Sequence, residues 1–377
     1  MPKDEQSDTS STIKSSSSSD RKPATLRRKQ LVDAISNDSF NDWYQEQQFT
    51  ENILEGKPYF NGASPPPDSE KHSPSKLLQC HRKVRYYAEN SPKEGDPPQG
   101  LFWVGSQFEE EIVVPYLLEA IATDETYVRN SMWIDTEIET NDGTVRLKGV
   151  TDPVIVDADG DPILVTEIKT TSSLDYLDGP KPHHKAQLHA YMYALDEEYD
   201  RSLQDGLLLY GGRDTLDISV FHIPFDERFW NKSVITWMQA QTQYRANNEL
   251  PPREPAFDWE CNTCPFRNRC GQTSAPFQDT GFTGLLTGFT DYREPNLREY
   301  FDAYPGAKLT PTLAHEYPVL AEQYGVYNWK CRGCGSTYAW DDVDVESDSP
   351  LCDRCAENND LQTIVVLGPN EQNVDTP

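Results

Sequence analysis

The sequence predicts a mixed α/β fold, in which a sheet is flanked by helices, followed by a small cysteine-bearing module. Three observations lead to this expectation. Helical and strand patterns alternate through the middle of the chain. Four cysteines gather in two short steps near its end. With 377 residues, 36% of them hydrophobic, the chain can form two or three domains and fill at least one sizeable core.

The first 30 residues are rich in serine and contain an unbroken run of five, a composition typical of a disordered tail. A short helix is expected over 31–48, before a run of three prolines interrupts the pattern. We place the α/β domain at 31–280, a linker with a helix near 312–323 at 281–325, and the cysteine-bearing module with its tail at 326–377.

Two helices are expected at the start of the α/β domain. The first begins at Ser73, a good helix cap with Pro74 at the first helical position, and carries Cys80 on its apolar face. The second covers 107–121. The pattern then changes to an antiparallel meander, with strands over 133–140, 144–150, 153–156 and 163–168.

A helix over 183–195 follows the meander. His183 and His184 at its start are expected only to form a polar helix entry. The domain is completed by two more strands and a longer helix, which we expect over 206–210, 218–223 and 227–247. This order of elements favours a mixed sheet with helices on its faces.

The hairpin around Asp159-Gly160 brings charged residues together. With a two-residue turn there, the numbers of paired residues add up to 319, so Asp152 lies opposite Glu167. Lys169 projects from the same strand face as Glu167, because side chains alternate along a strand. The sequence therefore predicts two carboxylates and an ammonium group on one patch.

Such a patch suits a divalent cation that would bridge the two carboxylates and a phosphate oxygen, with Lys169 orienting a water or neutralising the developing charge. A lone D…E-x-K pattern is more often a solvated strand face with an ion pair. The neighbouring residues favour the functional interpretation. Gln187 and Tyr191 lie four apart on one helix face, and Glu109 follows Gly105 by four in the earlier helix.

These segments together resemble the ordered motifs of RecB-type PD-(D/E)XK nucleases: Gly105 to Glu109, Gly149-Val150-Thr151-Asp152, Glu167-Ile168-Lys169 and Gln187-Leu188-His189-Ala190-Tyr191. With one cysteine before them and three after, the resemblance is closest to the iron–sulfur exonucleases associated with CRISPR adaptation, and it covers about 73–270. It implies a restriction-endonuclease-like core, dependence on Mg or Mn, and cleavage of DNA, often from single-stranded ends.

The resemblance also implies roles for individual residues. Asp152 and Glu167 would ligate the metal, and Lys169 would be the catalytic lysine. Gln187 and Tyr191 would belong to the RecB-type extension. Glu109 stands where many members carry histidine, so it would act as an indirect metal ligand.

The first cysteine group is Cys261, Cys264 and Cys270, in the spacing C-x2-C-x5-C, and the fourth soft ligand available to it is the distant Cys80. Four thiolates hold either an iron–sulfur cluster or structural zinc, and the spacing does not choose between them. In either case the site would tie the first helix to the end of the α/β domain. The family resemblance favours a [4Fe-4S] cluster.

The second group, Cys331-x2-Cys334 and Cys352-x2-Cys355 with 17 residues between the pairs, matches the spacing of a zinc ribbon. Zinc would fold a segment that has too little apolar area to fold alone. Two interpretations of this ribbon are open: a purely structural mini-domain and a docking module. The acidic loop makes phosphate binding unfavourable, so we expect a protein partner; its acids are Asp341, Asp342, Asp344 and Glu346.

The composition restricts the setting. A net charge of -28 would ordinarily repel nucleic acid. An acidic surface is, however, a common way to stay soluble in molar salt, so we expect a halophilic source, in which the Debye length falls to about 3 Å and the repulsion from DNA largely vanishes. No apolar run is long enough to span a membrane, and no P-loop occurs, so we expect no membrane and no helicase motor. Eight cysteines and the absence of a secretory signal favour a reducing cytoplasm.

The sequence therefore predicts a metal-dependent DNA exonuclease with an iron–sulfur site and a zinc ribbon, acting in CRISPR spacer acquisition. Two alternatives remain open. One is a DNA repair or recombination nuclease outside CRISPR. The other is a non-catalytic DNA-binding adaptor with the same fold, which the retention of Asp152, Glu167 and Lys169 argues against.

Overall fold

The computed structural model describes residues 24–36, 39–40, 43–44, 46, 65–95, 99–175, 177–274, 277, 279–343 and 350–372. The chain divides into two units, residues 1–61 and 62–377, which we treat separately. Most of the expected disordered tail, residues 1–23, lies outside the described residues, as do Asp344 and Glu346 of the acidic ribbon loop.

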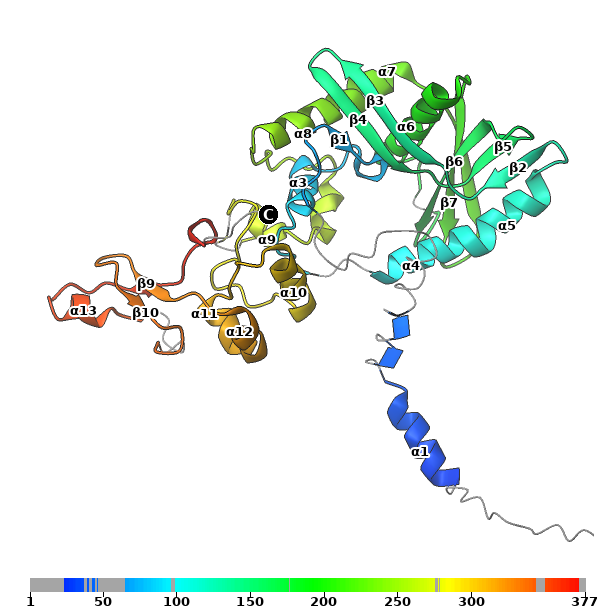
Figure 1. The fold of residues 1–377 in the computed structure, drawn as a ribbon. Helices are drawn as coiled ribbons and strands as arrows, with labels where there is room; N and C mark the ends of the chain where they lie inside the picture. The colour runs from blue at the N-terminus through cyan, green and yellow to red at the C-terminus, as the bar shows by residue number, and fades with distance from the viewer. Residues whose placement is uncertain are drawn as a thin grey trace, which may run out of the picture. The chain divides into compact units, whose positions relative to one another are not determined.

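The first unit contains helix α1 (Ala24–Ala34), drawn in blue in Figure 1. It begins inside the segment expected to be disordered, and most of its residues are good helix formers, such as alanine, leucine, arginine and lysine. Of the helix expected over 31–48, α1 covers the first four residues, and positions 39–40, 43–44 and 46 are also helical.

A five-stranded mixed sheet forms the centre of the second unit, in the order β2-β5-β6-β7-β8 (Figure 1). Strands β6 and β7 run parallel, and the other neighbours are antiparallel. The expected mixed α/β fold is thereby confirmed. The strands are β2 (Thr126–Arg129), β5 (Val154–Asp157), β6 (Pro162–Thr171), β7 (Asp205–Gly212) and β8 (Ile218–Pro224).

A second sheet has the order β1-β4-β3, from β1 (Lys71–His72), β3 (Trp133–Thr140) and β4 (Gly143–Val150). The single meander expected over 133–168 is therefore wrong: its first hairpin belongs to this sheet and its second to the central one. Thr151 closes the first hairpin by bonding Met132 in both directions, each at 2.9 Å. Strand β5 then pairs with β2, a strand that the sequence did not predict.

The helix expected from Ser73 onward is interrupted. A 3-10 turn, η1 (Pro74–Lys76), is followed by Leu78 with a φ of 56°, and α3 (His81–Ala88) begins only after Cys80. The Cys80 N–H donates to the buried Glu260 carboxylate at 3.0 Å, and this contact replaces a helical hydrogen bond. Cys80 therefore caps α3 instead of lying on its apolar face.

A helical segment over 99–121 covers the expected helix and begins eight residues earlier. It changes twice into π-helical turns, which are frequent at functional sites. Its parts are α4 (Gln99–Phe108), η2 (Glu109–Val113), α5 (Val114–Tyr116) and η3 (Leu117–Ile121).

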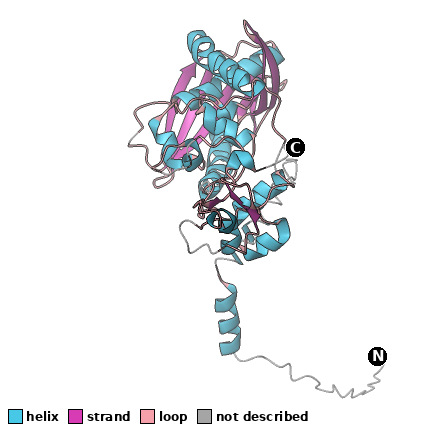
Figure 2. Cartoon of the chain, turned by 90° about the vertical axis from the view of Figure 1, so that its left-hand side faces the viewer, coloured by secondary structure: helices cyan, strands magenta, loops and turns pink. Residues whose placement is uncertain are grey.

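The central sheet is covered by helices on both faces, as Figures 1 and 2 show with the strands between helices. Helix α6 (Pro182–Tyr199) packs Leu188 and Met192 on one face, against Val165 and Leu208. The α4–η3 segment packs on the opposite face against Ile168 and Leu209. Residues 165, 167 and 169 of β6 therefore face α6, and Ile168 faces α4.

The smaller sheet has its own covering helices. The segment expected over 227–247 forms α7 (Glu227–Phe229), η4 (Trp230–Ile235) and α8 (Thr236–Ala246). Its Trp230 and Met238 share a core with Val145 and Leu147 of β4.

The rest of the unit is helical and then cysteine-bearing. Among the described residues, no helix is both long and apolar enough to cross a membrane. The helix expected near 312–323 is split at Tyr317 by Pro318, which lacks an N–H. The elements are η5 (Asp258–Thr263), α9 (Arg267–Cys270), α10 (Glu294–Ala303), α11 (Pro311–Glu316), α12 (Pro318–Tyr324), β9 (Trp329–Cys331), β10 (Thr337–Tyr338), α13 (Asp353–Ala356), β11 (Ile364–Val365) and η6 (Pro369–Glu371).

His72 on β1 makes the stability of this unit depend on pH. Its side chain is buried and hydrogen-bonded to Thr242, and burial, followed by the charges of Arg245 and His81, lowers its pKa from 6.5 to about 3. Between these values the unfolded chain binds a proton that the folded chain excludes. We therefore expect stability to fall as the pH drops from 6.5 toward 3, with His72 contributing at most about 1.4 kcal/mol per pH unit.

The thermal unfolding midpoint of His72→Gln should accordingly fall less between pH 6.5 and 4.5 than that of the wild type. His222→Gln, at an exposed histidine of β8, serves as the control. Equal slopes for the wild type and His72→Gln would contradict the expectation.

Candidate active site

The β5–β6 hairpin places the two expected carboxylates side by side. Val154 pairs with Val165 and Ile155 with Leu164, which is the expected register. The two-residue turn is nevertheless wrong. The loop has three residues, 158–160, since the Asp157 N–H donates to the Asp161 carbonyl and Gly160 has a φ of 88°. A bulge after Ile155 compensates for the extra residue.

Asp152 lies just before β5 and reaches across to β6. Its Oδ2 accepts a hydrogen bond from the Ile168 N–H at 2.7 Å, which fixes the carboxylate beside Glu167. Burial raises the pKa of Asp152, while the charge of Lys169 and the Ile168 hydrogen bond act in the opposite direction. The Asp152 carboxylate is therefore held in a poorly solvated position.

Glu167, in the middle of β6, is completely buried. Its Oε1 forms an ion pair with Lys169, and its Oε2 has no hydrogen-bond donor within the described part of the chain. Burial, followed by the charge of Asp152, raises the pKa of Glu167 well above its ordinary value. Buried carboxylate oxygens without donors are costly unless a cation is bound, so these two acids fit a hard divalent ion.

Lys169 places a positive charge beside the two carboxylates. Burial acts to lower the pKa of its ammonium group, but the carboxylates of Glu167 and Asp152 outweigh burial and raise it. Lys169 is therefore charged at neutral pH. Its side chain is 29% exposed, whereas that of Glu167 is closed to solvent, so the ammonium group lies on the open side of the patch.

Helix α6 adds a hydrogen-bonded pair. The Gln187 Nε2 donates to the Tyr191 hydroxyl at 2.7 Å, and both residues are buried. Burial, followed by the charges of Glu167 and Asp152, raises the pKa of Tyr191 well above its ordinary value. Tyr191 therefore stays protonated next to the two acids, with a hydroxyl that can donate a hydrogen bond.

Glu109 is the first residue of the π-helical η2. Its charge contributes to the raised pKa of both Glu167 and Tyr191, so it lies near the same site. It does not complete a compact ligand set. Within the described residues, only the ribbon cysteines bring three or more metal-binding groups within 4.8 Å of one another. An indirect role for Glu109, through water, remains a prediction.

His183 and His184, expected only as a polar helix entry, lie beside the site. The His184 Nδ1 is 2.9 Å from the hydroxyl of Tyr210, the β7 residue paired with Lys169. Burial first, and then neighbouring charges that include Lys169, lower the pKa of His183 to about 4 and of His184 to about 2. The parallel pairing of β6 with β7 causes this proximity, and sequence reasoning did not use it.

The first cysteine group lines one pocket, to which Cys80, Cys261, Cys264 and Cys270 all contribute. The segments that carry these cysteines also make hydrogen bonds that do not involve the sulfurs. Glu260 accepts from the Cys80 N–H, and Glu94 accepts from the N–H groups of Asn268 and Arg269 at 2.6 and 2.7 Å. The expected gathering of Cys80 with the three later cysteines is thus present.

The sulfurs of this pocket are widely spaced. No three of them lie within 4.8 Å of one another, since the described residues contain just one such group and it is elsewhere. A single tetrahedral zinc ion with Zn–S bonds near 2.3 Å requires sulfurs about 3.8 Å apart. The pocket is therefore more open than a mononuclear zinc site.

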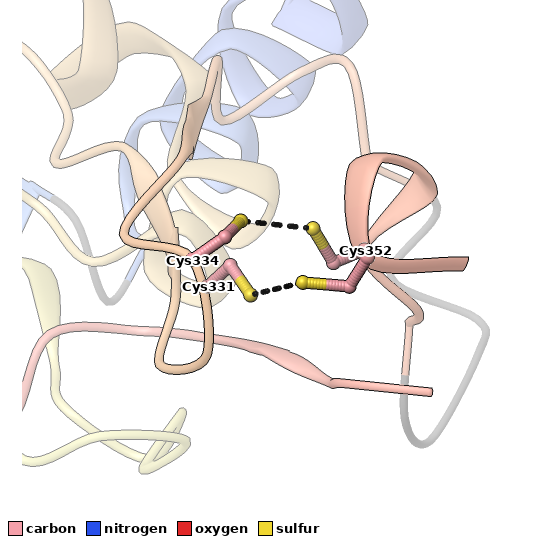
Figure 3. A group of neighbouring side chains, drawn as sticks. Cys331, Cys334 and Cys352 are labelled. Atoms are coloured by element: carbon pink, nitrogen blue, oxygen red, sulfur yellow. Dashed lines mark hydrogen bonds between the residues drawn. The ribbon is translucent and has the colours of Figure 1, made fainter. Parts of the chain in front are cut away.

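The second cysteine group is compact, as Figure 3 shows. The Cys331 and Cys355 sulfurs are 3.7 Å apart, those of Cys334 and Cys352 are 3.5 Å apart, and all four lie within 4.8 Å. This spacing fits one tetrahedral metal ion. The hydrogen bond with the Ser336 side chain, followed by the Ser336 N–H, lowers the pKa of Cys334 to about 6, which favours the thiolate that a metal binds.

The fold and the buried acids beside a charged lysine define a class of protein, the metal-dependent nucleases. The comparison with known families agrees: residues 48–271, more than half of the chain, match the PD-(D/E)XK nuclease superfamily, and the chain belongs to it. Glu167-Ile168-Lys169, within the matched range, has the residue pattern (D/E)XK.

Other comparisons add little. No curated protein matches the chain. Twenty chains of solved structures match, among them one titled "Crystal structure of SSO0001", which is 20% identical over 59% of this chain and 93% of that chain, with a TM-score of 0.39. At this TM-score the likeness supports no conclusion about function.

Proposed function

We propose that the protein is a metal-dependent DNA exonuclease whose active site consists of Asp152, Glu167 and Lys169, assisted by Gln187, Tyr191 and Glu109. Membership of the superfamily supports metal-dependent nuclease activity in general. The single observation that carries this choice of residues is Glu167, a fully buried carboxylate with one donor-free oxygen, beside Asp152 and paired with Lys169.

The carboxylates of Asp152 and Glu167 would hold Mg²⁺ or Mn²⁺, which, when bound, supplies positive charge to the phosphate and acidifies a water. Lys169 would hydrogen-bond the attacking water or neutralise the charge that develops on the phosphate oxygens. The attacking water would give up a proton to solvent as its oxygen forms a bond to phosphorus, the bond to the leaving oxygen would break, and the leaving oxygen would take up a proton from solvent. Tyr191, held by Gln187, would donate its hydroxyl hydrogen to the substrate.

We further propose a [4Fe-4S] cluster on Cys80, Cys261, Cys264 and Cys270. A cubane cluster binds each thiolate to a different iron atom, so it needs wider sulfur spacing than zinc. The open arrangement of these four sulfurs favours the cluster, and the compact spacing of the ribbon sulfurs favours zinc there.

The setting that we propose rests on the sequence. CRISPR spacer acquisition follows from the resemblance to the iron–sulfur exonucleases, with repair or recombination as the alternative. A halophilic source and a cytoplasmic location follow from the charge of -28 and the free cysteines. The zinc ribbon would bind a protein partner.

The proposed function is tested with labelled linear and circular single-stranded DNA and with duplex DNA, in high KCl with Mn²⁺. The wild type should shorten linear strands and leave circular strands intact, and Asp152→Asn should abolish the shortening. Asp135→Asn is the matched control, at a more exposed carboxylate that pairs with Arg146 on the smaller sheet. Cleavage of circular DNA would exclude an exonuclease, and binding without cleavage would favour the adaptor.

A further inference from the structure

A group of aromatic and basic side chains lies at the start of α6 and η5. We call it the Trp259 cluster, and it consists of Lys181, His183, Phe257 and Trp259. The Trp259 and Phe257 rings are stacked, with centroids 5.8 Å apart and planes at 13°. The His183 ring is 5.5 Å from that of Trp259, and the Lys181 ammonium lies 5.8 Å from the Trp259 ring centre.

The Trp259 cluster is connected to the active site. The His183 ring lies 4.1 Å from that of His184, and His184 bonds Tyr210, the residue paired with Lys169. Lys181 joins the same connection, because its N–H donates to the Tyr210 hydroxyl at 3.0 Å. These contacts connect Tyr210, next to Lys169 in the sheet, with Trp259.

The Trp259 cluster also borders the first cysteine pocket. Trp259 is two residues before Cys261, and Glu260 between them bonds the Cys80 N–H. Lys83, which lines that pocket, is close enough to act electrostatically on both His183 and Cys264. Lys181 and Trp259 are thus in contact with each other near the start of α6, and Lys83 adds a further basic position at the pocket.

The side chain at the centre of the Trp259 cluster is exposed. Trp259 is 47% exposed, although its neighbours His183 and Phe257 are partly buried. The acid Glu260 is buried and occupied by backbone donors, which leaves Asp258 as the exposed acid of the η5 turn next to Trp259. In a chain with a net charge of -28, lysines beside an exposed indole are a local departure from the overall charge.

Proteins that bind single strands without sequence preference combine aromatic rings, on which bases stack, with cations that follow the backbone. We propose that single-stranded DNA leaves the Asp152–Glu167 site across the Trp259 cluster, with one base stacked on Trp259 and backbone phosphates beside Lys181 and Lys83. This inference rests on the proposed function. Trp259 is a binding residue in this account and takes no part in bond cleavage.

The test is binding of a 15-nucleotide oligo-dT that carries the fluorescent base 2-aminopurine at one position, moved along the strand in a series. Fluorescence anisotropy without divalent ions gives the Kd, and quenching of 2-aminopurine reports stacking. We expect Trp259→Ala to weaken binding about tenfold or more and to remove the quenching at one position. Trp259→Phe should keep the quenching and most of the affinity.

Trp133→Ala is the matched control, because Trp133 on β3 is 58% exposed and also lies beside a lysine, Lys148, at 5.3 Å. It should bind as the wild type does. Lys181→Gln should lower the slope of log K against log salt by about 0.7. The same series with oligo-rU distinguishes DNA from RNA, and preference for RNA would overturn the DNA assignment.

The cleavage assay separates this inference from the proposed function. If the wild type cleaves DNA and Trp259→Ala binds and is quenched as the wild type is, the stacking site is wrong and the nuclease assignment stands. If Trp259→Ala loses binding, but neither the wild type nor any variant cleaves DNA with any divalent metal tested, the stacking site stands and the catalytic assignment is wrong.

Discussion

Lys169→Ala is expected to reduce the rate of DNA cleavage by at least about a hundredfold. The variant removes the ammonium group that would hydrogen-bond the water or stabilise the developing charge, and losing one such group typically costs this much. It also removes the charge that opposes the raised pKa of Glu167. Because the carboxylate must be ionised to hold a cation, we expect the residual activity to require a higher pH than the wild type does.

The measurement is single-turnover cleavage of labelled DNA over a range of pH. Lys148→Ala is the control, since Lys148 is partly exposed like Lys169 and pairs with a single acid, Asp135, on the other sheet. Lys169→Arg should recover part of the rate, because it restores a positive charge. If Lys169→Ala cleaves DNA at the wild-type rate, Lys169 takes no part in the mechanism.

Cys331→Ser is expected to unfold the zinc ribbon and leave the rest of the second unit folded. Cys331 is fully buried in the ribbon core, which contains seven buried residues, three of them cysteines. So small a core depends on its metal, and structural zinc contributes about 10–16 kcal/mol in isolated zinc-finger peptides. The variant should lose one equivalent of zinc and become sensitive to protease within residues 329–366.

Zinc content by mass spectrometry and the sites of limited proteolysis check this expectation. Arg354→Ala is the control, because the Arg354 side chain is exposed next to the cysteines and donates to the Ser336 hydroxyl instead of lying in the ribbon core. Full zinc content and full protection in Cys331→Ser would contradict a structural metal in the ribbon.

The site residues on β6 could be predicted from sequence because their placement depends on local geometry. Alternation along one strand puts Glu167 and Lys169 on the same face, and a short hairpin brings Asp152 close. The predicted turn was nevertheless one residue too short. The expected register holds only because the bulge after Ile155 removes the difference, and nothing in the residue types at 155 and 156 signals that bulge.

The other errors concern long-range contacts. β2 pairs with β5 after β3 and β4 intervene in the chain, and no local pattern identifies such a partner. Cys80 was expected on a helix face, but its position is set by Glu260, 180 residues later. His183 and His184 lie near the site because His184 contacts Tyr210, which pairs with Lys169. That pairing depends on the parallel arrangement of β6 and β7, which no local pattern reveals.

The two cysteine groups differ in what holds their surroundings together. Around the first, the Glu260 carboxylate accepts from the Cys80 N–H, and the Glu94 carboxylate accepts from the N–H groups of Asn268 and Arg269 just before Cys270, so sulfur ligation is not the only contact that holds these segments. If this site holds the proposed cluster, we expect the folded protein to be able to lose it and bind it again. The described part of the ribbon has only a small core, so we expect its proposed zinc to bind as that module folds. We therefore expect the first cysteine site to be refilled in the folded protein and the ribbon to need its metal in order to fold.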